Sequence, residues 1–576
     1  MSNSYTAPLD DTLFILEHVI RWETLFDLPA YRHVDSDLAR AVLTEGAKFC
    51  EQVLGPINAV GDEQGSVIQD GKVKTPDGFR EAYKSFTAAG WPGLDMPEEF
   101  GGQQLPLTVQ VAFAEMLNGA CLSFAMLPLM LRAASRLLID HAAEDLKQQV
   151  VPRLIKGEWG ATICISEAQA GSDVGRIKTT AEIQADGSYR LTGTKVFITY
   201  ADHDLTGQII HLVLARTPGA PPGTRGISLF LVPKLMFDGG QANGVRVERL
   251  EKKMGLKASP TCVMRLEDAT GYRIGEENRG LNAMFTMVNL MRLEVSVQGP
   301  AIGAAATAKA LKYAAERPQG GAPDAGAVNI IEHADVKRML LLMHCRTMAM
   351  RALVFEAASN LDLARHGGDE DSRQQALQLA EFLLPVCKAC GSETGFDVAS
   401  LAVQVFGGHG YITESGVEQY VRDVRVAAIY EGTNGIQALD LVTRKLLRDQ
   451  GARFQTLTGK IASTLAGISV TGPIEQIYLA TQTGLAVLER TTRHVMQMAS
   501  DQRWPDVEFI AKDYCLLTGL VAGAWMWLRI AHATGGYDRD KLLNNINCAR
   551  FYAEYLMPEM HTLAHRINIS FSEMEG

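Results

Sequence analysis

Glu431 is the residue in this sequence whose neighbours best suit proton-transfer chemistry. It follows Ile429 and Tyr430 and precedes Gly432 and Thr433, so its carboxylate is expected in a largely apolar setting. Such a setting raises the pKa of a carboxyl group and makes it a capable general base. The same pattern also fits a glutamate that is solvated or lies at a helix N-terminus, and the residues alone leave both interpretations open.

Three further segments carry residues suited to holding a ring or a phosphate. Gln404–Tyr411 contains a glycine pair, which lets the backbone approach a flat or charged group closely. Cys164–Asp173 contains hydroxyl residues and a glycine, which donate hydrogen bonds to a phosphate or a ring heteroatom. In Gly193–Thr199, Phe197 stands between strand hydrophobes and is suited to stacking on a flat ring. The alternative for the last two segments is an ordinary turn followed by a strand of the core.

The elements that must position these residues follow the order helical, β, helical, helical. The chain reads as helix-rich up to about residue 160. Short apolar-alternating runs then predict a compact all-β domain of about a hundred residues. The expected strands are Tyr189–Thr199, interpreted as two strands around a turn at Gly193, and Ile209–Ala215, Gly226–Pro233 and Val245–Leu250.

Helical periodicity returns after Gly280 and persists to the end of the chain. Beyond Arg448, two apolar stripes that begin at Val507 and Leu542 recur at steps of three and four residues. Each stripe needs a partner surface, so this block is predicted to pack as a bundle on the rest. The expected long helices before it are Asn282–Arg317, Ile330–His366 and Ser372–Phe406.

Composition excludes several classes of protein. Among 576 residues, 66 are acidic and 55 basic, which gives a net charge of −11 and disfavours a nucleic-acid-binding protein. Nine scattered cysteines favour a reducing compartment, and the lone Cys387–Cys390 pair completes no metal site. The apolar run Cys515–Leu528 is shorter than the ~20 residues that span a bilayer. Met1–Asp11 lacks a basic start. We expect a cytoplasmic enzyme with no metal and no transmembrane segment.

Taken together and in this order, the motifs resemble those of the acyl-CoA dehydrogenase family of flavoproteins. Supporting matches are Met96–Gly102, Lys253–Ser259 and Gly275–Leu281, with Arg292 beyond. The resemblance covers roughly residues 45 to 450. It implies a mostly α fold with an inserted β-barrel domain: a helical N-terminal domain (41–160), a β-barrel middle domain (161–273) and a C-terminal four-helix-bundle domain (274–450), flanked by an N-terminal extension (1–40) and an extra C-terminal helical domain (451–576).

The resemblance also implies FAD as the cofactor, lying between the β domain and the C-terminal helices and partly covered by a neighbouring subunit. Ser166 matches the position that hydrogen-bonds the flavin pyrimidine edge, and Ser172 matches one near the flavin phosphates. Phe197 matches an aromatic residue packed against the isoalloxazine, usually Trp in the family, and Thr199 matches the hydroxyl near flavin N5. Ser166 stands where Thr is common.

The other end of FAD is expected to meet a neighbouring subunit. Gln404, Gly407 and Gly408 match the stretch that reaches the adenosine half of FAD in the partner subunit, and Thr433 matches a further contact in the same site. Arg317 matches the arginine that contacts the FAD pyrophosphate across the interface, although the family's usual downstream Phe-Gly is replaced here.

For catalysis, Glu431 aligns with the family's base, which removes the α proton while the β hydrogen leaves as hydride to flavin N5. Gly432 beside it and Arg292 are assigned to substrate binding, and a domain-packing salt bridge is the alternative for Arg292. Some members place the base just before that arginine, where this chain has Met291. Glu294 lies on another face of the helix, which leaves Glu431 as the sole base.

The chain is longer at both ends than ordinary members, which resembles a C-terminally extended bacterial subgroup. This implies 3-methylmercaptopropionyl-CoA or a fatty acyl-CoA as substrate, electron-transfer flavoprotein as electron acceptor, and a homodimer rather than a tetramer. The alternatives are an acyl-CoA oxidase, which passes electrons to oxygen, and a non-catalytic scaffold with the same fold.

Overall fold

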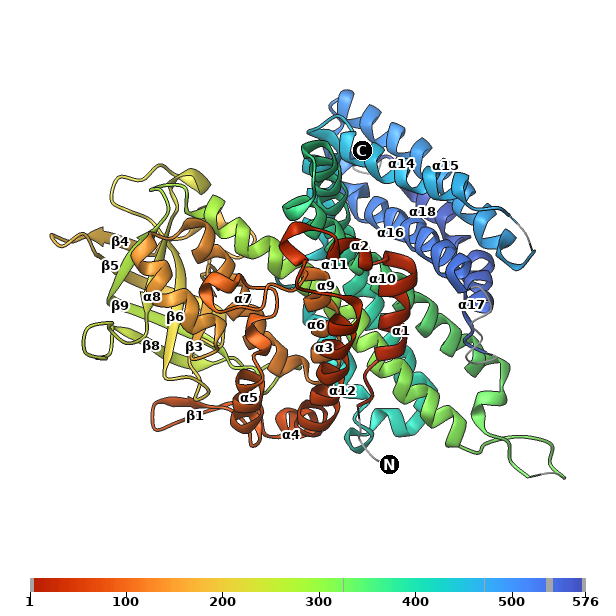
Figure 1. Ribbon diagram of the computed structural model, residues 1–576, viewed down its shortest axis with the longest axis horizontal. Coiled ribbons are helices and arrows are strands. Elements are labelled where there is room, and N and C mark those ends of the chain that lie inside the picture. The colour runs from red at the N-terminus through yellow and green to blue at the C-terminus, as the bar shows by residue number, and fades with distance from the viewer. Residues whose placement is uncertain (1–4, 325, 471, 535–541, 572–576) are drawn as a thin grey trace. The chain divides into compact units, whose positions relative to one another are not determined.

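The computed structural model describes residues 5–324, 326–470, 472–534 and 542–571 (Figure 1). Backbone contacts divide the chain into two compact units. Both are assembled from stretches that are separated in sequence. The helical unit comprises Met1–Lys48, Pro106–Gly119 and Val295–Gly576, and the sheet unit comprises Phe49–Leu105 and Ala120–Glu294.

The sheet unit is built around seven strands in the hydrogen-bonded order β3, β6, β7, β9, β5, β4, with β8 also paired to β9. β3 and β6 are parallel, and the other pairs are antiparallel. The described strands follow an open path from β3 to β4, so the closed barrel that the sequence predicted is not confirmed. The strands are β3 (Trp159–Cys164), β4 (Thr180–Ile183), β5 (Tyr189–Thr199), β6 (Gln208–Ala215), β7 (Ser228–Pro233), β8 (Val245–Leu250) and β9 (Thr261–Ile274).

Strand β5 is one continuous strand, so the predicted turn at Gly193 was wrong. Gly193 pairs with Leu266 of β9. A Cβ built on Gly193 would lie 2.5 Å from Thr179 Oγ1 and 2.9 Å from Thr179 Cα. A neighbouring segment therefore passes too close to this position for any side chain. Close approach of another segment is one reason for a glycine inside a strand.

Helices cover this sheet (Figure 1), and the helix packed against β3 is mostly apolar. This helix, α7, and helix α16 of the helical unit are the two described helices that are long and apolar enough to cross a membrane. The most apolar stretch of α7 is 94% buried and that of α16 is 83% buried, as expected of core helices. The elements outside the main sheet are α4 (Gly55–Gln64), the hairpin β1–β2 (Val67–Gln69, Lys72–Lys74), α5 (Phe79–Ala88), α7 (Leu122–His141) and α8 (Glu144–Ile155).

Three long helices form the centre of the helical unit, and they match the predicted spans to within a few residues. Helix α9 begins in the sheet unit, and its residues from Val295 onward belong to the helical unit. Buried Asp362 on α10 accepts hydrogen bonds from Tyr31 Oη (2.6 Å) and Leu107 N (2.8 Å), which fixes two N-terminal segments to this helix. The described helices are α1 (Leu9–Phe14), α2 (Glu23–Phe26), α3 (Ser36–Phe49), α6 (Leu107–Ala120), α9 (Gly280–Glu316), α10 (Ala334–His366), α11 (Glu370–Phe406), α12 (Glu418–Val424) and α13 (Asn434–Leu439).

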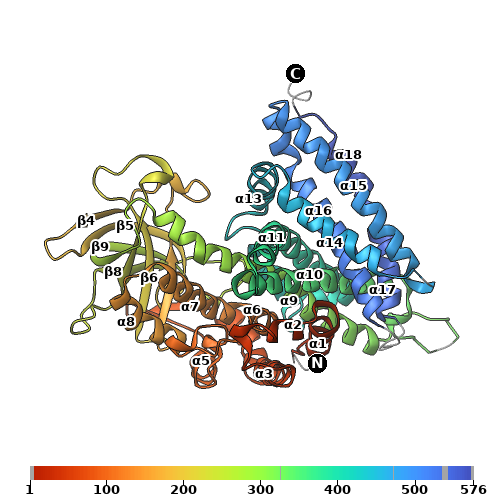
Figure 2. The same cartoon turned by 45° about the horizontal axis from the view of Figure 1, so that its top comes forward.

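The C-terminal region forms a further bundle, in which α15, α16 and α18 lie side by side (Figure 2). The apolar stripe predicted from Val507 to Leu528 is buried along α16, and this helix packs on both α10 and α11. The prediction of a bundle packed on the rest is therefore confirmed. Its helices are α14 (Ala452–Gly467), α15 (Glu475–Ser500), α16 (Trp504–Thr534), α17 (Asn545–Phe551) and α18 (Glu559–Ile567).

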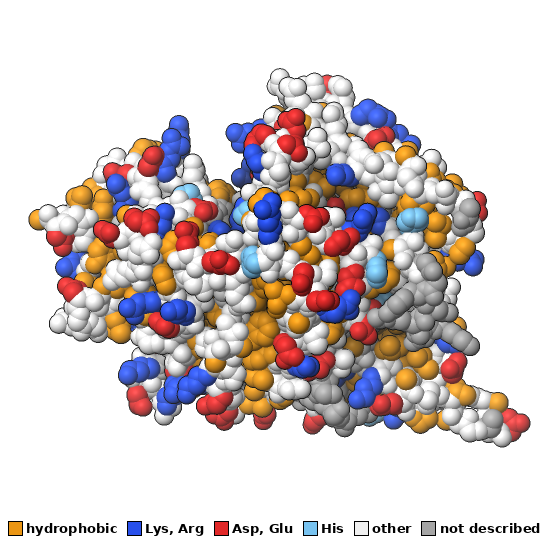
Figure 3. Space-filling model, viewed as in Figure 1, with side chains coloured by type: hydrophobic (Ala, Val, Ile, Leu, Met, Phe, Trp, Pro, Cys, Tyr) orange, Lys and Arg blue, Asp and Glu red, His pale blue; other side chains and the backbone are white. Residues whose placement is uncertain are grey.

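The surface mixes both signs of charge. On the face drawn in Figure 3, the acidic and basic side chains of the described residues are interspersed. An anionic ligand must therefore be met by a few placed groups, because an excess of acidic residues provides no attractive field for it.

Candidate functional site

Glu431 lies in a tight loop between α12 and α13 of the helical unit. Its side chain is half-buried, and its backbone adopts the left-handed conformation at φ 54°, followed by Gly432 at φ 89°. A non-glycine residue in this region costs of order 1–3 kcal/mol, so surrounding contacts must hold it. Gln437 Nε2 donates to the Glu431 carbonyl at 3.3 Å, and Lys388 Nζ donates to the Gly432 carbonyl at 2.6 Å. These two hydrogen bonds hold the left-handed backbone of the loop in place.

The side chains next to Glu431 serve the loop itself. Thr433 is the N-cap of α13, and its Oγ1 accepts a hydrogen bond from Ile436 N at 3.2 Å. Tyr430 Oη donates to Gln298 Oε1 on α9. The predicted cofactor contact of Thr433 stays a prediction, and its capping role is additional.

Lys388 supports the loop of Glu431, and sequence reasoning did not identify it. It lies on α11 with no exposed surface, and it binds both the Gly432 carbonyl and Asn434 Oδ1 (3.1 Å). Burying an ammonium group is costly unless it is hydrogen-bonded. The signal that could have found it is a single lysine within the apolar run Leu383–Ala389, where a charge needs a buried partner.

The residues expected near the adenosine and pyrophosphate of FAD gather at one end of the helical unit. Tyr313, one turn before Arg317, stacks on Phe406 with ring centroids 4.1 Å apart and an interplanar angle of 13°. This stack brings the end of α9 beside the end of α11, where Gln404, Gly407 and Gly408 are exposed. A Cβ built on either glycine meets no atom within 4 Å, so the backbone is open to approach by a ligand.

In the sheet unit, a β-bulge brings two predicted flavin contacts together. The pairing of β5 with β9 shifts register between Lys195 and Ile198. Within this bulge Phe197 has φ 61°, and its side chain is 66% exposed. The preceding residue, Val196, donates its N–H to the Ser166 carbonyl at 2.9 Å. The bulge therefore turns an aromatic ring outward beside the half-buried Ser166.

A buried lysine supports this bulge from behind. Lys195 Nζ donates to the Ile165 carbonyl (3.1 Å), the Leu214 carbonyl (2.8 Å) and Glu167 Oε1 (2.9 Å). Burial by itself raises the pKa of Glu167, but Lys195 and hydrogen bonds from Thr179 outweigh it and lower that pKa to about 2. Lys195 thus fixes the residues on both sides of Ser166.

The remaining predicted residues of the sheet unit have different surroundings. Thr199 is half-buried at the end of β5, and Ser172 is exposed in the loop after β3. The guanidinium of Arg292 lies 5.9 Å from the centroid of the Phe285 ring. Glu294 is buried and paired with Arg132, which also binds Asp95 at 2.9 Å. Burial raises the pKa of Glu294 despite this partner.

The structure thus places the predicted residues in two sets, one in each unit. Each set carries groups suited to part of a flavin dinucleotide: the sheet unit has an exposed aromatic ring on a bulge with adjacent hydroxyl and backbone groups, and the helical unit has an open glycine pair. The Phe197 ring is exposed and is therefore not part of the core of the sheet unit. The sheet unit holds Ser166, Ser172, Phe197, Thr199 and Arg292, and the helical unit holds Arg317, Gln404, Gly407, Gly408, Glu431, Gly432 and Thr433.

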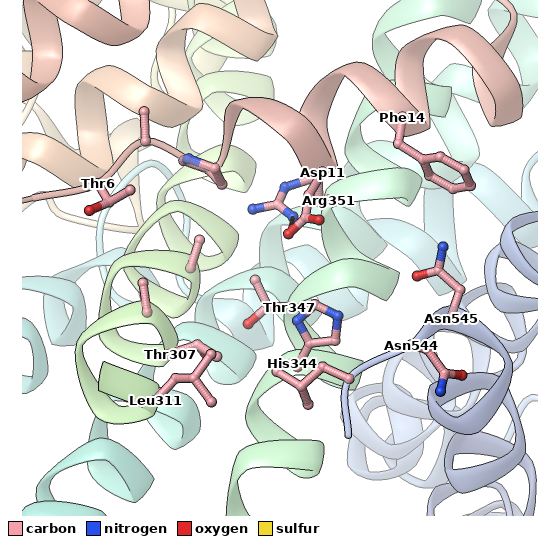
Figure 4. Close-up of a pocket in the computed structure, with 15 residues that line it drawn as sticks. Thr6, Asp11, Phe14, Thr307, Leu311, His344, Thr347, Arg351, Asn544 and Asn545 are labelled. Carbon is pink, nitrogen blue, oxygen red and sulfur yellow. Dashed lines mark ion pairs between the residues drawn. The ribbon is translucent and has the colours of Figure 1, made fainter. Parts of the chain in front are cut away.

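A cavity of about 270 Å³ in the helical unit contains none of these residues (Figure 4). It is lined by the N-terminal segment, α9, α10 and the residues before α17. Arg351 on its wall is held by Glu115 at 2.7 Å and by Asp11 at 3.7 Å. These contacts join the N-terminal extension to the core, so we assign the arginine a structural role.

Family models match nearly the whole chain. The N-terminal, middle and C-terminal domains of acyl-CoA dehydrogenase match residues 36–158, 162–269 and 278–447. A model described as acetyl-CoA dehydrogenase C-terminal like matches residues 457–573. These four matches follow one another in the order of the elements described above.

Individual proteins agree with these models. The 3-methylmercaptopropionyl-CoA dehydrogenase of Ruegeria pomeroyi is 40% identical over an alignment 578 positions long, which covers 98% of each chain. Among solved structures, Caenorhabditis elegans ACDH-11 in complex with C11-CoA has a TM-score of 0.78 at 22% identity, over 96% of this chain and 91% of that one. An acyl-CoA dehydrogenase complexed with FAD from Bacillus anthracis has a TM-score of 0.76 at 22% identity, over 93% and 88%.

Fold and matches together define an FAD-dependent oxidoreductase. The chain belongs to the acyl-CoA dehydrogenase family and carries an additional C-terminal domain.

Proposed function

We propose that this protein catalyses the α,β-dehydrogenation of an acyl-CoA thioester to the trans-2-enoyl-CoA, with Glu431 as the base. The observation that carries the proposal is the loop of Glu431, a half-buried carboxylate on a left-handed backbone that Gln437 and Lys388 hold in place. Bound FAD supplies the acceptor at flavin N5 for the β hydrogen, which leaves as hydride. Glu431 takes the α proton.

A carboxylate is too weak to remove a thioester α proton unless the charge that develops on the thioester oxygen is stabilised. We assign that task to the backbone N–H of Glu431, because a preorganised donor costs no reorganisation during the reaction. Gly432 is assigned to substrate binding beside the base, and Arg292 is assigned to the CoA side. Met291 has no proton-accepting group and Glu294 is buried against Arg132, which supports Glu431 as the sole base.

The cofactor contacts follow the two sets of residues. Ser166, Phe197 and Thr199 are assigned to the flavin and Ser172 to its phosphates. Arg317, Gln404, Gly407, Gly408 and Thr433 are assigned to the FAD of a partner subunit, so the working enzyme is a homodimer. Light scattering is expected to give twice the chain mass of 62.8 kDa.

We infer 3-methylmercaptopropionyl-CoA as the substrate and electron-transfer flavoprotein as the electron acceptor, in the cytoplasm. The substrate inference is supported by the Ruegeria pomeroyi enzyme of that name, since the match extends through the additional C-terminal domain. Straight-chain acyl-CoAs differ from this substrate by a methylene in place of a sulfur, so they are the competitors that an experiment must include.

The test is anaerobic bleaching of the bound flavin with a panel of acyl-CoAs. We expect 3-methylmercaptopropionyl-CoA to give a higher kcat/KM than butyryl- to palmitoyl-CoA, and the reduced enzyme to pass electrons to electron-transfer flavoprotein. A higher kcat/KM for a straight chain would reassign the substrate. Fast peroxide formation on admission of oxygen would reassign the protein as an oxidase, and absence of bleaching with every acyl-CoA would overturn dehydrogenation itself.

A further inference from the structure

Asn434 joins the base loop to a buried polar network. It is the first residue of α13, it is 6% exposed, and its Oδ1 accepts hydrogen bonds from Lys388 Nζ and from Ser392 Oγ, each at 3.1 Å. Lys388 in turn donates to the carbonyl of Gly432, the residue after Glu431. The amide of Asn434 therefore determines where Lys388 places its ammonium group, and Lys388 holds the backbone next to the base.

Hydrogen bonds also connect Asn434 to the additional C-terminal domain. Its Nδ2 donates to Glu393 Oε1 on α11 at 3.0 Å, and Lys512 Nζ of α16 lies 3.2 Å from that same oxygen. Helix α13 also packs on α16 (Figure 2). Burial raises the pKa of Glu393, but hydrogen bonds from Asn434 and Lys512, together with nearby positive charge, lower it overall. Glu393 is therefore an anion at neutral pH and can accept both hydrogen bonds.

We propose that the additional C-terminal domain positions the catalytic base through the path Lys512–Glu393–Asn434–Lys388–Gly432. Lys512 and Glu393 are positioning residues: they fix the orientation of the Asn434 amide, and with it the hydrogen bond that holds the loop of Glu431. The proposal rests on Glu431 being the base. It assigns a catalytic task to a domain that ordinary members of the family lack.

The physical argument is one of directionality. An asparagine side chain has one acceptor oxygen and one donor nitrogen, so an acceptor on one side fixes which end faces Lys388. Loss of the Glu393 anion, or of the Lys512 charge that holds it, weakens the shorter hydrogen bond of Nδ2, which also donates to the Ala389 carbonyl at 3.4 Å. The amide, whose Oδ1 still accepts from Lys388 and Ser392, is then held less firmly, and so is Gly432. Misplacement of a catalytic group by a fraction of an ångström lowers the rate of the chemical step without weakening substrate binding.

The test compares Lys512→Met, Lys512→Arg, Glu393→Gln and the double variant Lys512→Met/Glu393→Gln in the full-length holoenzyme. Arg566→Met is the matched control. Arg566, on α18, pairs at 3.9 Å with Asp513, which is next to Lys512 on α16, but this pair is not part of the path to the loop. The measurements are the rate of flavin reduction at saturating acyl-CoA per bound FAD, the KM, the isotope effect with an α-deuterated substrate, and the Tm.

We expect Lys512→Met and Glu393→Gln each to reduce the rate of flavin reduction about fivefold, the effect of one partly exposed charged contact. KM stays constant, a full isotope effect remains, and Lys512→Arg restores the rate. The double variant is no slower than the slower single variant, because both substitutions interrupt one path. Arg566→Met matches the wild type.

A Lys512→Met rate within twofold of wild type, a change in KM alone, or additive losses in the double variant would overturn the path. Glu431→Gln, measured alongside, separates this failure from that of the proposed function. If Glu431→Gln still reduces flavin at the wild-type rate, the base assignment itself is wrong. If it does not, and Lys512→Met is normal, only the path is wrong.

Discussion

The loop of Glu431 in the helical unit and the bulge of Phe197 in the sheet unit, to which we assign the base and a flavin contact, are built on the same plan. Each places a functional side chain on a left-handed backbone, Glu431 at φ 54° and Phe197 at φ 61°. A fully buried lysine supports each from behind, Lys388 or Lys195, by donating to main-chain carbonyls. In both places, hydrogen bonds from a buried lysine help to hold a strained backbone in position.

The two lysines differ in how far their networks extend. Lys195 binds the carboxylate of Glu167 directly, so its network is completed within the sheet unit. The hydrogen bonds of Lys388 to Gly432 and Asn434 involve neutral oxygens, and the network continues through Glu393 to the C-terminal domain. The support of Phe197 is thus contained in one unit, whereas the support of the Glu431 loop continues, under our proposal, into the additional C-terminal domain.

The largest expected effect is that of Glu431→Gln. A general base contributes about 10²- to 10⁴-fold, and the amide of glutamine cannot take a proton, so flavin reduction by acyl-CoA should fall by at least about 10²-fold. Absorbance at the flavin band should show FAD still bound. Retention of more than about a tenth of wild-type turnover would contradict the role of Glu431 as base.

Substituting each lysine by methionine separates the two networks. Lys195→Met leaves Glu167 buried without its cation, so we expect a loss of about 3–5 kcal/mol in the free energy of unfolding. Lys388→Met removes the donor that holds Gly432, so we expect turnover per bound FAD to fall about 10- to 100-fold. Urea unfolding and stopped-flow flavin reduction, measured on both variants, check the contrast. Equal losses of stability with normal turnover in both variants would remove the distinction.

Acid should weaken the sheet unit through two buried histidines. Burial lowers the pKa of His211 to about 3 and that of His203 to about 4. An unfolded histidine has a pKa near 6.5, so below that pH the unfolded chain binds protons that the folded unit does not. Stability is therefore complete above pH 6.5 and falls towards pH 4, by about 1.4 kcal/mol per pH unit for each histidine.

Thermal unfolding between pH 7.5 and 4.5 measures this slope, and His203→Gln/His211→Gln is the matched variant because glutamine does not titrate. We expect the variant to have a shallower dependence of Tm on pH. An unchanged slope would assign the acid sensitivity to other groups.

The smallest expected effect on stability is that of Phe197→Ala. Its ring is 66% exposed, so removing it should change the free energy of unfolding of the apoprotein by no more than about 0.5 kcal/mol. The affinity for FAD should fall, because the ring is assigned to stack on the isoalloxazine. Titration of apoprotein with FAD measures this, and unchanged affinity would show that Phe197 does not contact the flavin.

Local sequence patterns predicted the features that depend on neighbouring residues. Helical periodicity predicted the three long helices α9, α10 and α11, and the motifs around Ser166, Gly407 and Glu431 identified the family that the comparisons confirm. The turn predicted at Gly193 was wrong. The glycine is needed because Thr179, from another segment, packs too close to it for a side chain. The closed barrel was not confirmed for a similar reason, since strand order depends on pairing between distant segments.

The sequence by itself determined the chemistry of this protein: the residue types, their short spacings and the periodicity of the helices are local properties of the chain. Only the tertiary structure decided how that chemistry is held in place. Lys388 and Gly432 are 44 residues apart, and Lys512 and its partner Glu393 are farther apart still. Such contacts depend on where a buried charge finds its partners, and the cost of leaving it unpaired is set by the folded interior rather than by its sequence neighbours.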